Sequence, residues 1–245
     1  MTLTLATNAP DGEAEIFASI QGEGPSMGKP CAFVRLSRCN LACQWCDTAY
    51  TWRFEGDERP HHDDVAFNRK ANQVTLEDEE VAARIDALGK ERLVVTGGEP
   101  LLQAKDLARM LTLLPGMEVE IETNGTIAPP PVLDALVSQY NVSPKLAHSG
   151  NEADLALIPE RLAQWAGHPR AWLKFVIASP EDIEQVLEIK DRYVIPSERI
   201  MLMGEGTDAE TLREREAWLV GSCITHNLTL SKRLHIELFG DTRAT

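Results

Sequence analysis

Residues 31–46 read CAFVRLSRCNLACQWC, a largely apolar stretch that runs into a loop holding three of the chain's five cysteines. The stretch 31–36 predicts a short buried strand. Cys39, Cys43 and Cys46 follow with the spacing C-x3-C-x2-C. Iron–sulfur clusters are normally held by four cysteines. Three thiolates on one tight loop leave one iron of a cubic cluster free for a substrate or cofactor, so we expect a reactive cluster.

Zinc and disulfides are the alternative uses of these cysteines. Structural zinc takes four closed ligands, usually from two separated pairs, and the sequence offers no second pair. Cys31 begins a predicted strand and Cys223 falls in the helical run 214–226, where a buried thiol is common. Disulfides are disfavoured by the odd number of cysteines and their tight spacing.

The rest of the chain alternates between strand and helix patterns, which indicates a parallel sheet with right-handed crossovers. Predicted strands are 31–36, 92–95, 117–122, 140–142, 171–178 and 200–203; predicted helices are 75–88, 104–114, 131–139, 152–165, 180–193 and 207–225. Thr75 and Ser179 are the expected caps of two of these helices. About six parallel strands are too few for a closed eight-stranded barrel. We therefore expect an α/β fold, a partial open barrel in one domain over residues 1–245.

Residues 52–73 break this rhythm. The segment WRFEGDERPHHDDVAFNRKANQ is polar and unpatterned, so it is interpreted as an inserted loop. His61 to Asp64 within it could suggest a metal site, but a solvated charged run is the preferred interpretation.

Composition favours a small-molecule ligand. The 245 residues carry a net charge of −14 and no basic stripe, whereas nucleic-acid binding requires one. The sequence has no apolar run long enough to span a membrane, and its N-terminus lacks the features of a signal peptide. Free cysteines without an export signal indicate the reducing cytoplasm.

Short polar and glycine-rich motifs follow successive predicted strands. They are Thr96–Pro100 (TGGEP), Glu122–Gly125 (ETNG), Ser143–Lys145 (SPK) and Met203–Gly206 (MGEG), with Lys174 inside the fifth strand. Ligands bind at the carboxyl ends of parallel strands. We therefore expect these motifs to converge beside the cysteine loop.

This set of motifs resembles the radical S-adenosylmethionine (SAM) enzymes. Their hallmark is the C-x3-C-x2-C loop with an aromatic residue, here Trp45, before the last cysteine, together with a GGEP motif. The resemblance implies a [4Fe–4S] cluster on Cys39, Cys43 and Cys46 whose free iron binds SAM. Gly97 and Gly98 permit close backbone approach, and the cofactor supplies the reactive radical, so no catalytic side chain is expected.

The N-terminal region resembles the 7-carboxy-7-deazaguanine synthases of queuosine biosynthesis, a tRNA modification pathway. Glu15–Gly24 (EIFASIQGEG) and Cys46–Thr48 (CDT) carry this resemblance, which extends from residue 15 to about 240. It implies a lyase that converts 6-carboxy-5,6,7,8-tetrahydropterin to 7-carboxy-7-deazaguanine with loss of ammonia, through a 5′-deoxyadenosyl radical and assisted by Mg²⁺.

The resemblance also assigns binding residues. Those expected at the substrate are Ile20, Gln21, Gly22, Glu23, Arg35 and Thr96. Those expected at SAM are Trp45, Cys46, Asp47, Gly98, Glu99, Glu122, Ser143, Pro144, Lys145, Met203, Gly204, Glu205 and Gly206. Thr48 is the expected Mg²⁺ ligand, with capping of local backbone as its alternative role. Arg35 suits a carboxylate on chemical grounds, with an internal salt bridge as the alternative.

The expected partners are a low-potential electron donor such as flavodoxin and a second copy of the chain in a cytoplasmic homodimer. Two other functions stay open at this point: another radical SAM enzyme, such as a glycyl-radical activase, and a non-catalytic metal-binding module. Gly204 stands where many relatives have proline, and the C-terminal residues differ from those of some relatives. Substrate contacts near the C-terminus, including any by His235, are therefore not assigned.

Overall fold

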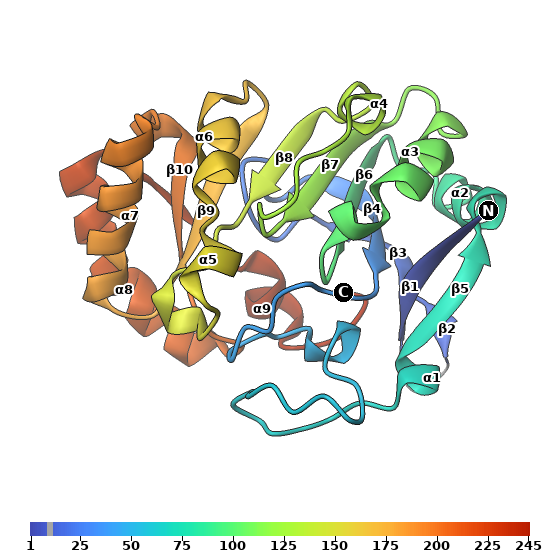
Figure 1. Ribbon diagram of the computed structural model, residues 1–245, viewed down its shortest axis with the longest axis horizontal. Helices are drawn as coiled ribbons and strands as arrows, with labels where there is room; N and C mark the ends of the chain where they lie inside the picture. The colour runs from blue at the N-terminus through green and yellow to red at the C-terminus, as the bar shows by residue number, and fades with distance from the viewer. Residues whose placement is uncertain (9–11) are drawn as a thin grey trace.

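The computed structural model describes residues 1–8 and 12–245, and its strands form one eleven-stranded sheet (Figure 1). The order is β11-β10-β9-β8-β7-β6-β4-β1-β2, with β3 also paired to β4 and β5 to β1. The strands are β1 (Thr2–Asn8), β2 (Glu13–Ala14), β3 (Ile16–Ile20), β4 (Pro30–Leu36), β5 (Gln73–Glu77), β6 (Arg92–Gly97), β7 (Glu118–Thr123), β8 (Gln139–Val142), β9 (Ala171–Ile177), β10 (Ile200–Gly204) and β11 (Thr229–Ser231).

The strands from β4 through β6, β7, β8, β9 and β10 to β11 are all parallel to their neighbours. This run stays open, because β11 lies at one edge of the sheet and β4 continues into antiparallel pairing with β1 and β3 at the other. The predicted open α/β architecture is therefore confirmed. β11 adds a parallel strand to the six expected; its three residues are too short to give a recognisable pattern.

The helices are α1 (Arg69–Asn72), α2 (Asp78–Asp86), α3 (Ala104–Thr112), α4 (Pro131–Asp134), α5 (Ala153–Ala156), α6 (Pro159–Gly167), α7 (Pro180–Tyr193), α8 (Ala209–His226) and α9 (Leu234–Phe239), with 3₁₀ turns η1 (Ala49–Thr51), η2 (Pro100–Gln103), η3 (Ala147–Ser149) and η4 (Ser197–Arg199). Helices α2, α3, α6, α7 and α8 pack on the outer face of the sheet, whereas α9 carries residues that line a cavity (Figure 1). Two apolar clusters fill the interface: β4 and β6 with α2 and α3, and β9 and β10 with α6, α7 and α8.

The inner face of the same strands is polar near their carboxyl ends. Side chains alternate between faces along a strand, so Arg35, Thr96, Glu122, Asn141 and Lys174 lie opposite the apolar residues that contact the helices. The register pairs Arg35 with Thr96 and Glu122 with Asn141. The outer face thus supplies the core, and the inner face supplies ligand-binding groups.

One predicted helix begins later than expected. Residues 75–88 were expected to be helical from Thr75, but Gln73–Glu77 is strand β5, and α2 begins at Asp78. β5 pairs antiparallel with β1, Thr4 opposite Thr75. The alternating sequence QVTLE suits a strand, and β1, which the sequence did not reveal, offers an edge for it.

Two other predicted helices are shorter. The helix expected over 131–139 ends at Asp134 because Gln139 already belongs to β8. The helix expected over 152–165 is divided into α5 and α6, with Pro159 at the first position of α6. Proline lacks a backbone N–H and is favoured at that first position. By contrast, α7 begins at Pro180 as predicted, and Ser179 and Asp182 form its capping box.

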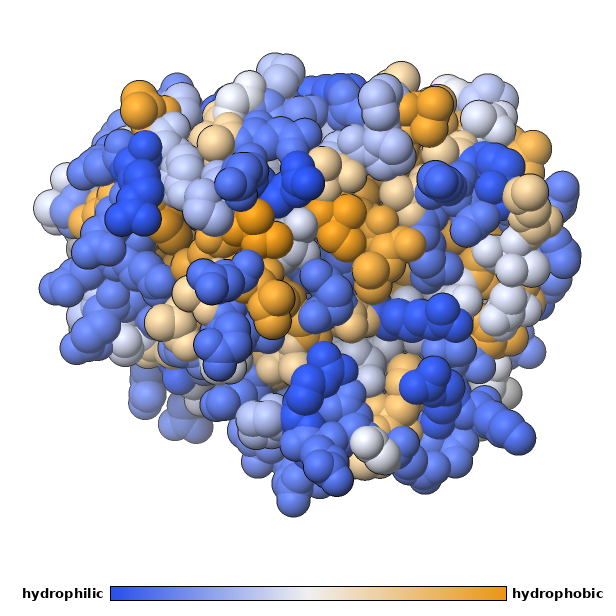
Figure 2. Space-filling view, viewed as in Figure 1, coloured by the Kyte–Doolittle hydropathy of each residue, from blue (hydrophilic) through white to orange (hydrophobic). Residues whose placement is uncertain are grey.

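The segment 52–73 is irregular up to Asn68 and then forms α1 and the start of β5. An isolated bridge joins Phe54 to Phe67, and Trp52 and Phe54 are buried. The view in Figure 2 shows hydrophilic residues around the rim of the molecule and apolar residues gathered towards the middle of this face. Within the described residues, no helix combines the length and apolar character needed to cross a membrane.

Candidate active site

A cavity of about 240 Å³ opens at the carboxyl ends of the parallel strands, where α/β enzymes bind their ligands. Except for Glu99 and Pro144, every residue assigned from the sequence to cluster, cofactor, substrate or Mg²⁺ lines it. These lining residues are Ile20, Gln21, Gly22, Glu23, Arg35, Cys39, Cys43, Trp45, Cys46, Asp47, Thr48, Thr96, Gly98, Glu122, Ser143, Lys145, Met203, Gly204, Glu205 and Gly206.

The cysteine loop forms one wall of this cavity. Cys39, Cys43 and Cys46 all line it, and they pack with Leu41 and Ala156 in a small apolar cluster. The backbone N–H of Cys46 donates to the carbonyl of Cys43 at 3.2 Å, which tightens the loop. Cys31 and Cys223 lie instead in β4 and α8 and are not among the lining residues.

The environment of the three thiols suits a cluster. Burial raises the pKa of Cys39 to about 12 and that of Cys46 to about 11, so thiolates there need a positively charged partner such as iron. The amide of Asn151 donates to Cys43 Sγ at 3.2 Å, and that of Asn124 points at Cys39 Sγ from 3.9 Å. Hydrogen bonds to the sulfurs are a usual feature of iron–sulfur sites. Three sulfur donors with amide support therefore fit the implied [4Fe–4S] cluster.

Gly97 and Gly98 are required by the close packing of two strand ends. Gly97 has φ +140°, and a Cβ there would lie 1.9 Å from the carbonyl oxygen of Leu36. A Cβ at Gly98 would lie 2.2 Å from the carbonyl oxygen of Arg38. The end of β6 is thus pressed against the segment that leads into the cysteine loop.

Glu99 lies beneath the cavity. It is fully buried and accepts hydrogen bonds from the N–H groups of Leu101 (2.9 Å) and Asn124 (2.7 Å) and from the hydroxyl of Thr123 (2.9 Å). Burial raises its pKa despite these donors. Its carboxylate joins η2 to the turn after β7, so it holds two walls of the cavity together. Its contact with SAM stays a prediction.

Glu122 lines the cavity and accepts hydrogen bonds from two other lining residues. Thr96 Oγ1 donates to its Oε2 at 2.7 Å and Gln21 Nε2 to its Oε1 at 3.2 Å, while Gln21 also donates to Glu120 at 2.6 Å. Thr96 and Gln21 were both assigned to the substrate and Glu122 to SAM. Their hydrogen bonds place all three in one group.

Arg35 makes an internal ion pair and also lines the cavity. Its Nε donates to Glu15 Oε2 at 2.7 Å, and the hydroxyl of Tyr50 donates to the same oxygen at 3.2 Å. Within residues 1–8 and 12–245, Nε is the one atom of this guanidinium with a hydrogen bond. The ion pair fixes the side chain, and its two terminal nitrogens stay available to a ligand.

A group of paired charges lies opposite, at the loop after β3. Glu23 forms ion pairs with Lys174 and with Arg233 (3.1 Å), and Arg233 also pairs with Asp47. Burial opposes ionisation of Glu23 and Asp47, but Lys174 and Arg233 hold the pKa of Glu23 below its usual value, and Arg233 does the same for the pKa of Asp47. Sequence analysis missed Arg233, because its partners are distant along the chain. Lys174 carried a signal, a lone charge within the apolar strand AWLKFVI.

His235 and the C-terminal residues complete the mouth of the cavity. His235 lines the cavity with Nε2 4.0 Å from Glu23, and burial lowers its pKa. The guanidinium of Arg243 lies 3.5 Å from the ring centroid of Tyr50, and its NH1 donates to Asn72 Oδ1 at 3.1 Å. The sequence left this region unassigned, and these contacts bring it to the cavity.

Trp45, Ser143 and Lys145 form a second side of the cavity. Lys145 Nζ donates to Ser143 Oγ at 2.8 Å and lies 5.5 Å from the ring centroid of Trp45. Trp45 stacks on His148 at 5.4 Å. These contacts bring together the loop after β8 and the aromatic residue of the cysteine loop; their binding to SAM stays a prediction.

The hydroxyl of Thr48 lies 3.6 Å from Cys46 Sγ and lines the cavity. Thr48 is the N-cap residue of η1, yet in the described chain its side chain makes no capping hydrogen bond. The alternative role considered for it, capping of local backbone, is therefore not seen. Within the described residues, the one hydrogen-bond contact of this hydroxyl is the one with Cys46 Sγ.

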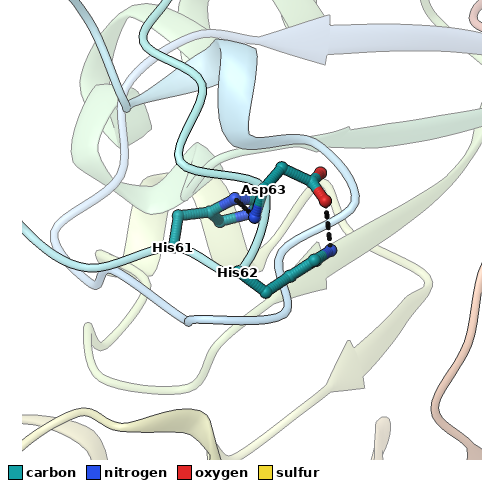
Figure 3. A group of neighbouring side chains, drawn as sticks. All are labelled: His61, His62 and Asp63. Atoms are coloured by element: carbon teal, nitrogen blue, oxygen red, sulfur yellow. Dashed lines mark hydrogen bonds and ion pairs between the residues drawn. The ribbon is translucent and has the colours of Figure 1, made fainter.

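His61, His62 and Asp63 group together on the inserted segment (Figure 3). The rings of the two histidines stack at 4.5 Å with an interplanar angle of 27°. Each ring nitrogen of this pair already has a partner: His61 Nδ1 accepts from the N–H of Asp63, and His62 Nε2 pairs with the Asp63 carboxylate. His61 Nε2 donates to the carbonyl of Cys46 (2.8 Å), and His62 Nδ1 donates to that of Gln44 (2.7 Å).

These two bonds make the histidine pair a latch between the insertion and the cysteine loop. His61 is buried, so the predicted solvated run is wrong at this residue, whereas Asp64 is exposed as predicted.

Comparison with known proteins places this geometry in a family. Residues 34–152 match the model of the radical SAM superfamily. The 7-carboxy-7-deazaguanine synthase of Pyrobaculum aerophilum is 35% identical over 94% of this chain and 95% of its own length. That of Hyperthermus butylicus is 32% identical over 95% of this chain and 94% of its own. The crystal structure of QueE from Escherichia coli superimposes with a TM-score of 0.64 at 27% identity, covering 95% of each chain.

The open parallel sheet, the three-cysteine loop and the cavity beside it define a radical SAM enzyme, and membership of that superfamily implies a [4Fe–4S] cluster, SAM, a small-molecule substrate and an electron donor. Within the superfamily, the chain belongs to the 7-carboxy-7-deazaguanine synthases.

Proposed function

We propose that this chain converts 6-carboxy-5,6,7,8-tetrahydropterin to 7-carboxy-7-deazaguanine and ammonia, in queuosine biosynthesis. Substrate and products contain the same atoms, so the conversion consumes no external oxidant. The observation that carries the proposal is the grouping in one cavity of the cluster cysteines, the Thr96–Gly98 turn and the carboxylate of Glu122 with its two donors. Similarity to synthases over 94% of the chain supports the same substrate.

When bound, the cluster and SAM supply the radical that removes a hydrogen from the substrate. The chain's own task is then to hold the ligands in register and to keep water out. Cys39, Cys43 and Cys46 are the proposed cluster ligands. No side chain is proposed as an acid or base.

The pterin edge is assigned to Glu122, Gln21 and Thr96. A pterin presents N–H donors and a carbonyl acceptor along one edge. A carboxylate accepts two parallel N–H bonds, and Glu122 lines the cavity with both oxygens already oriented by neighbours. The geometry thus favours Glu122 as a substrate residue over its earlier assignment to SAM. Ile20, Gly22 and Glu23 complete the proposed substrate loop.

The substrate carboxylate is assigned to Arg35 and Mg²⁺. Two terminal nitrogens of a guanidinium match a carboxylate in a bidentate pair, and the ion pair with Glu15 orients Arg35 for it. Magnesium is often held by few protein ligands together with water and substrate oxygens. The hydroxyl of Thr48 lines the cavity and caps no backbone group, which supports its assignment as the Mg²⁺ ligand.

SAM is assigned to the side of the cavity between the cysteine loop and the ends of β8 and β10. Ser143 and Lys145 offer polar groups there, and Trp45 offers an aromatic face. The full proposed set is Trp45, Cys46, Asp47, Gly98, Glu99, Ser143, Pro144, Lys145, Met203, Gly204, Glu205 and Gly206, with Glu99 and Pro144 acting from behind the lining.

Four further points belong to the proposal. Residues 1–245 form a single radical SAM domain with an insertion at 52–73. The enzyme is a homodimer, as the resemblance implies. Its reductant is a low-potential protein such as flavodoxin. It works in the cytoplasm, where five free cysteines and a reduced cluster are compatible with the surroundings.

Anaerobic turnover tests the function. Reduced, cluster-loaded protein with SAM, Mg²⁺ and the carboxypterin should produce deazapurine absorbance. Release of 5′-deoxyadenosine without any deazapurine would favour a glycyl-radical activase or another radical enzyme. A colourless preparation containing zinc but no iron would favour a non-catalytic metal-binding module. The family membership of the chain favours neither alternative.

A further inference from the structure

Arg233 is bonded to three separate walls of the cavity. It lies between β11 and α9, and its side chain is 8% exposed. Nε donates to Glu23 Oε1 at 3.1 Å, NH1 donates to the carbonyl of Gly206 at 2.5 Å, and NH2 pairs with Asp47. All three nitrogens of one guanidinium are therefore committed, each to a different segment.

The three partners belong to different parts of the proposed site. Glu23 lies in the substrate loop, Asp47 directly follows the cluster ligand Cys46, and Gly206 ends the Met203–Gly206 turn on the SAM side. They lie 210, 186 and 27 residues from Arg233 along the chain. Local sequence does not fix the distances between these three partners. A side chain that bonds to all of them can fix those distances.

Arg233 belongs to a buried group of ion pairs. Glu23 forms ion pairs with Lys174 and Arg233, Asp47 forms one with Arg233, and burial lowers the pKa of His235 beside them. A buried charge that loses its partner is strongly unfavourable. Removing Arg233 would leave Asp47 without its ion pair and Glu23 with Lys174 alone, and the two loops would lose the side chain that joins them.

We propose that Arg233 is a positioning residue that couples the substrate loop to the SAM side of the cavity. It holds Glu23, Asp47 and the Gly206 carbonyl in one arrangement, so that occupation of one side favours binding at the other. This inference rests on the proposed function for the identity of the two sides. Arginine suits the task because its planar fork serves three acceptors at once, which the single ammonium of lysine does not.

The test compares cluster-loaded wild type with Arg233→Gln, Arg233→Lys and the control Arg170→Gln. Arg170 bonds to the carboxylate of Asp134 and to two carbonyls, but it directly precedes β9, at the amino-terminal end of that strand, and lies outside the cavity lining. Its loss removes a similar set of bonds. SAM affinity is measured by the change in the EPR signal of the reduced cluster, with and without the carboxypterin.

In wild type, pterin should tighten SAM binding, and the effect must be reciprocal. Arg233→Gln should abolish the coupling and weaken SAM binding in the absence of pterin by roughly tenfold, which corresponds to about 1.4 kcal/mol. Arg233→Lys should retain part of the SAM affinity and part of the coupling. Arg170→Gln should retain both in full, even if its melting temperature falls as much as that of Arg233→Gln.

SAM affinity and coupling in Arg233→Gln equal to those of Arg170→Gln would overturn the proposal. A different result separates this inference from the proposed function. If wild type does not bind the pterin but Arg233→Gln still loses SAM affinity, the role of Arg233 on the SAM side is supported and the proposed substrate is wrong.

Discussion

Thr96 Oγ1 lies 2.7 Å from Glu122 Oε2 and donates a hydrogen bond to it across neighbouring strands β6 and β7. Gln21 reaches the other oxygen of the same carboxylate from the loop after β3. Three segments thus aim polar groups at one point on the cavity floor, and a flat ligand with N–H donors on its edge can bind there. This point gives the first prediction.

Glu122→Gln should weaken pterin binding. The amide keeps the size of the side chain but replaces one acceptor oxygen by a donor, which costs about 1.5–3 kcal/mol for a hydrogen bond to a charged group. KM for the pterin should rise by roughly 10- to 100-fold, with the SAM-induced EPR change intact. Glu118→Gln, at the exposed start of the same strand, is the matched control. A loss of SAM binding with unchanged pterin KM would return Glu122 to the SAM side.

Cys43→Ala should prevent cluster retention, because two thiolates cannot replace three on the same loop. Cys223→Ala should leave the iron content unchanged, since that thiol is buried in α8 outside the cavity lining. Iron and sulfide analysis after anaerobic reconstitution checks both. Iron lost from Cys223→Ala alone would contradict the ligand assignment.

Thr48→Ala should lower the apparent affinity for Mg²⁺ in turnover by roughly tenfold. This is the effect expected when a ligand that contributes about 1.4 kcal/mol is lost. Thr48→Ser keeps the hydroxyl and should behave as wild type. Turnover is measured across a Mg²⁺ titration at saturating SAM. Identical titration curves for the alanine and serine variants would exclude Thr48 as a ligand.

His235 should make the protein less stable as the pH falls. Burial lowers its pKa in the folded state below the usual 6.5. The unfolded chain therefore binds more protons as the pH drops through 6.5, and stability is lost in that direction. His235→Gln should show a smaller fall in melting temperature between neutral and mildly acidic pH than wild type does. His226→Gln, at the end of α8, serves as the control and should retain the wild-type slope.

The histidine latch should protect the cluster from air. His61→Ala removes the bond to the Cys46 carbonyl, and a hydrogen bond of about 1 kcal/mol corresponds to about fivefold more frequent opening of the loop. Cluster absorbance should decay correspondingly faster on exposure to oxygen, whereas His226→Ala should decay as wild type. Equal decay in all three proteins would show that the insertion does not shield the cluster.

Six of the seven parallel strands were predictable because each has its own pattern and a glycine or proline nearby, whereas β11 is too short to show one. The N-terminal part of the sheet was not predictable. β1 and β5 stabilise one another by pairing, with Leu3 opposite Leu76, and nothing within either segment reveals the other. Thr75 thus looked like a helix cap, although its strand is fixed by residues some seventy positions away.

The candidate site divides in the same way. Motif residues such as Cys39, Thr96 and Ser143 could be found from local spacing. Arg233 and Tyr50 could not, because their importance lies in long-range contacts with Glu23 and Glu15. The burial of Glu99 could not be predicted either, because its carboxylate accepts hydrogen bonds from Thr123 and Asn124, at the end of the neighbouring strand β7.

Gly97 and Gly98, at the end of β6, are required by the packing of the backbone. A methyl group at Gly97 would overlap the carbonyl oxygen of Leu36, and one at Gly98 would overlap that of Arg38. The fold itself therefore forbids replacement of either glycine. A descendant that had abandoned SAM altogether would still need both. Their presence in a distant sequence is therefore evidence of architecture first, and evidence of chemistry only when the three sulfurs accompany them.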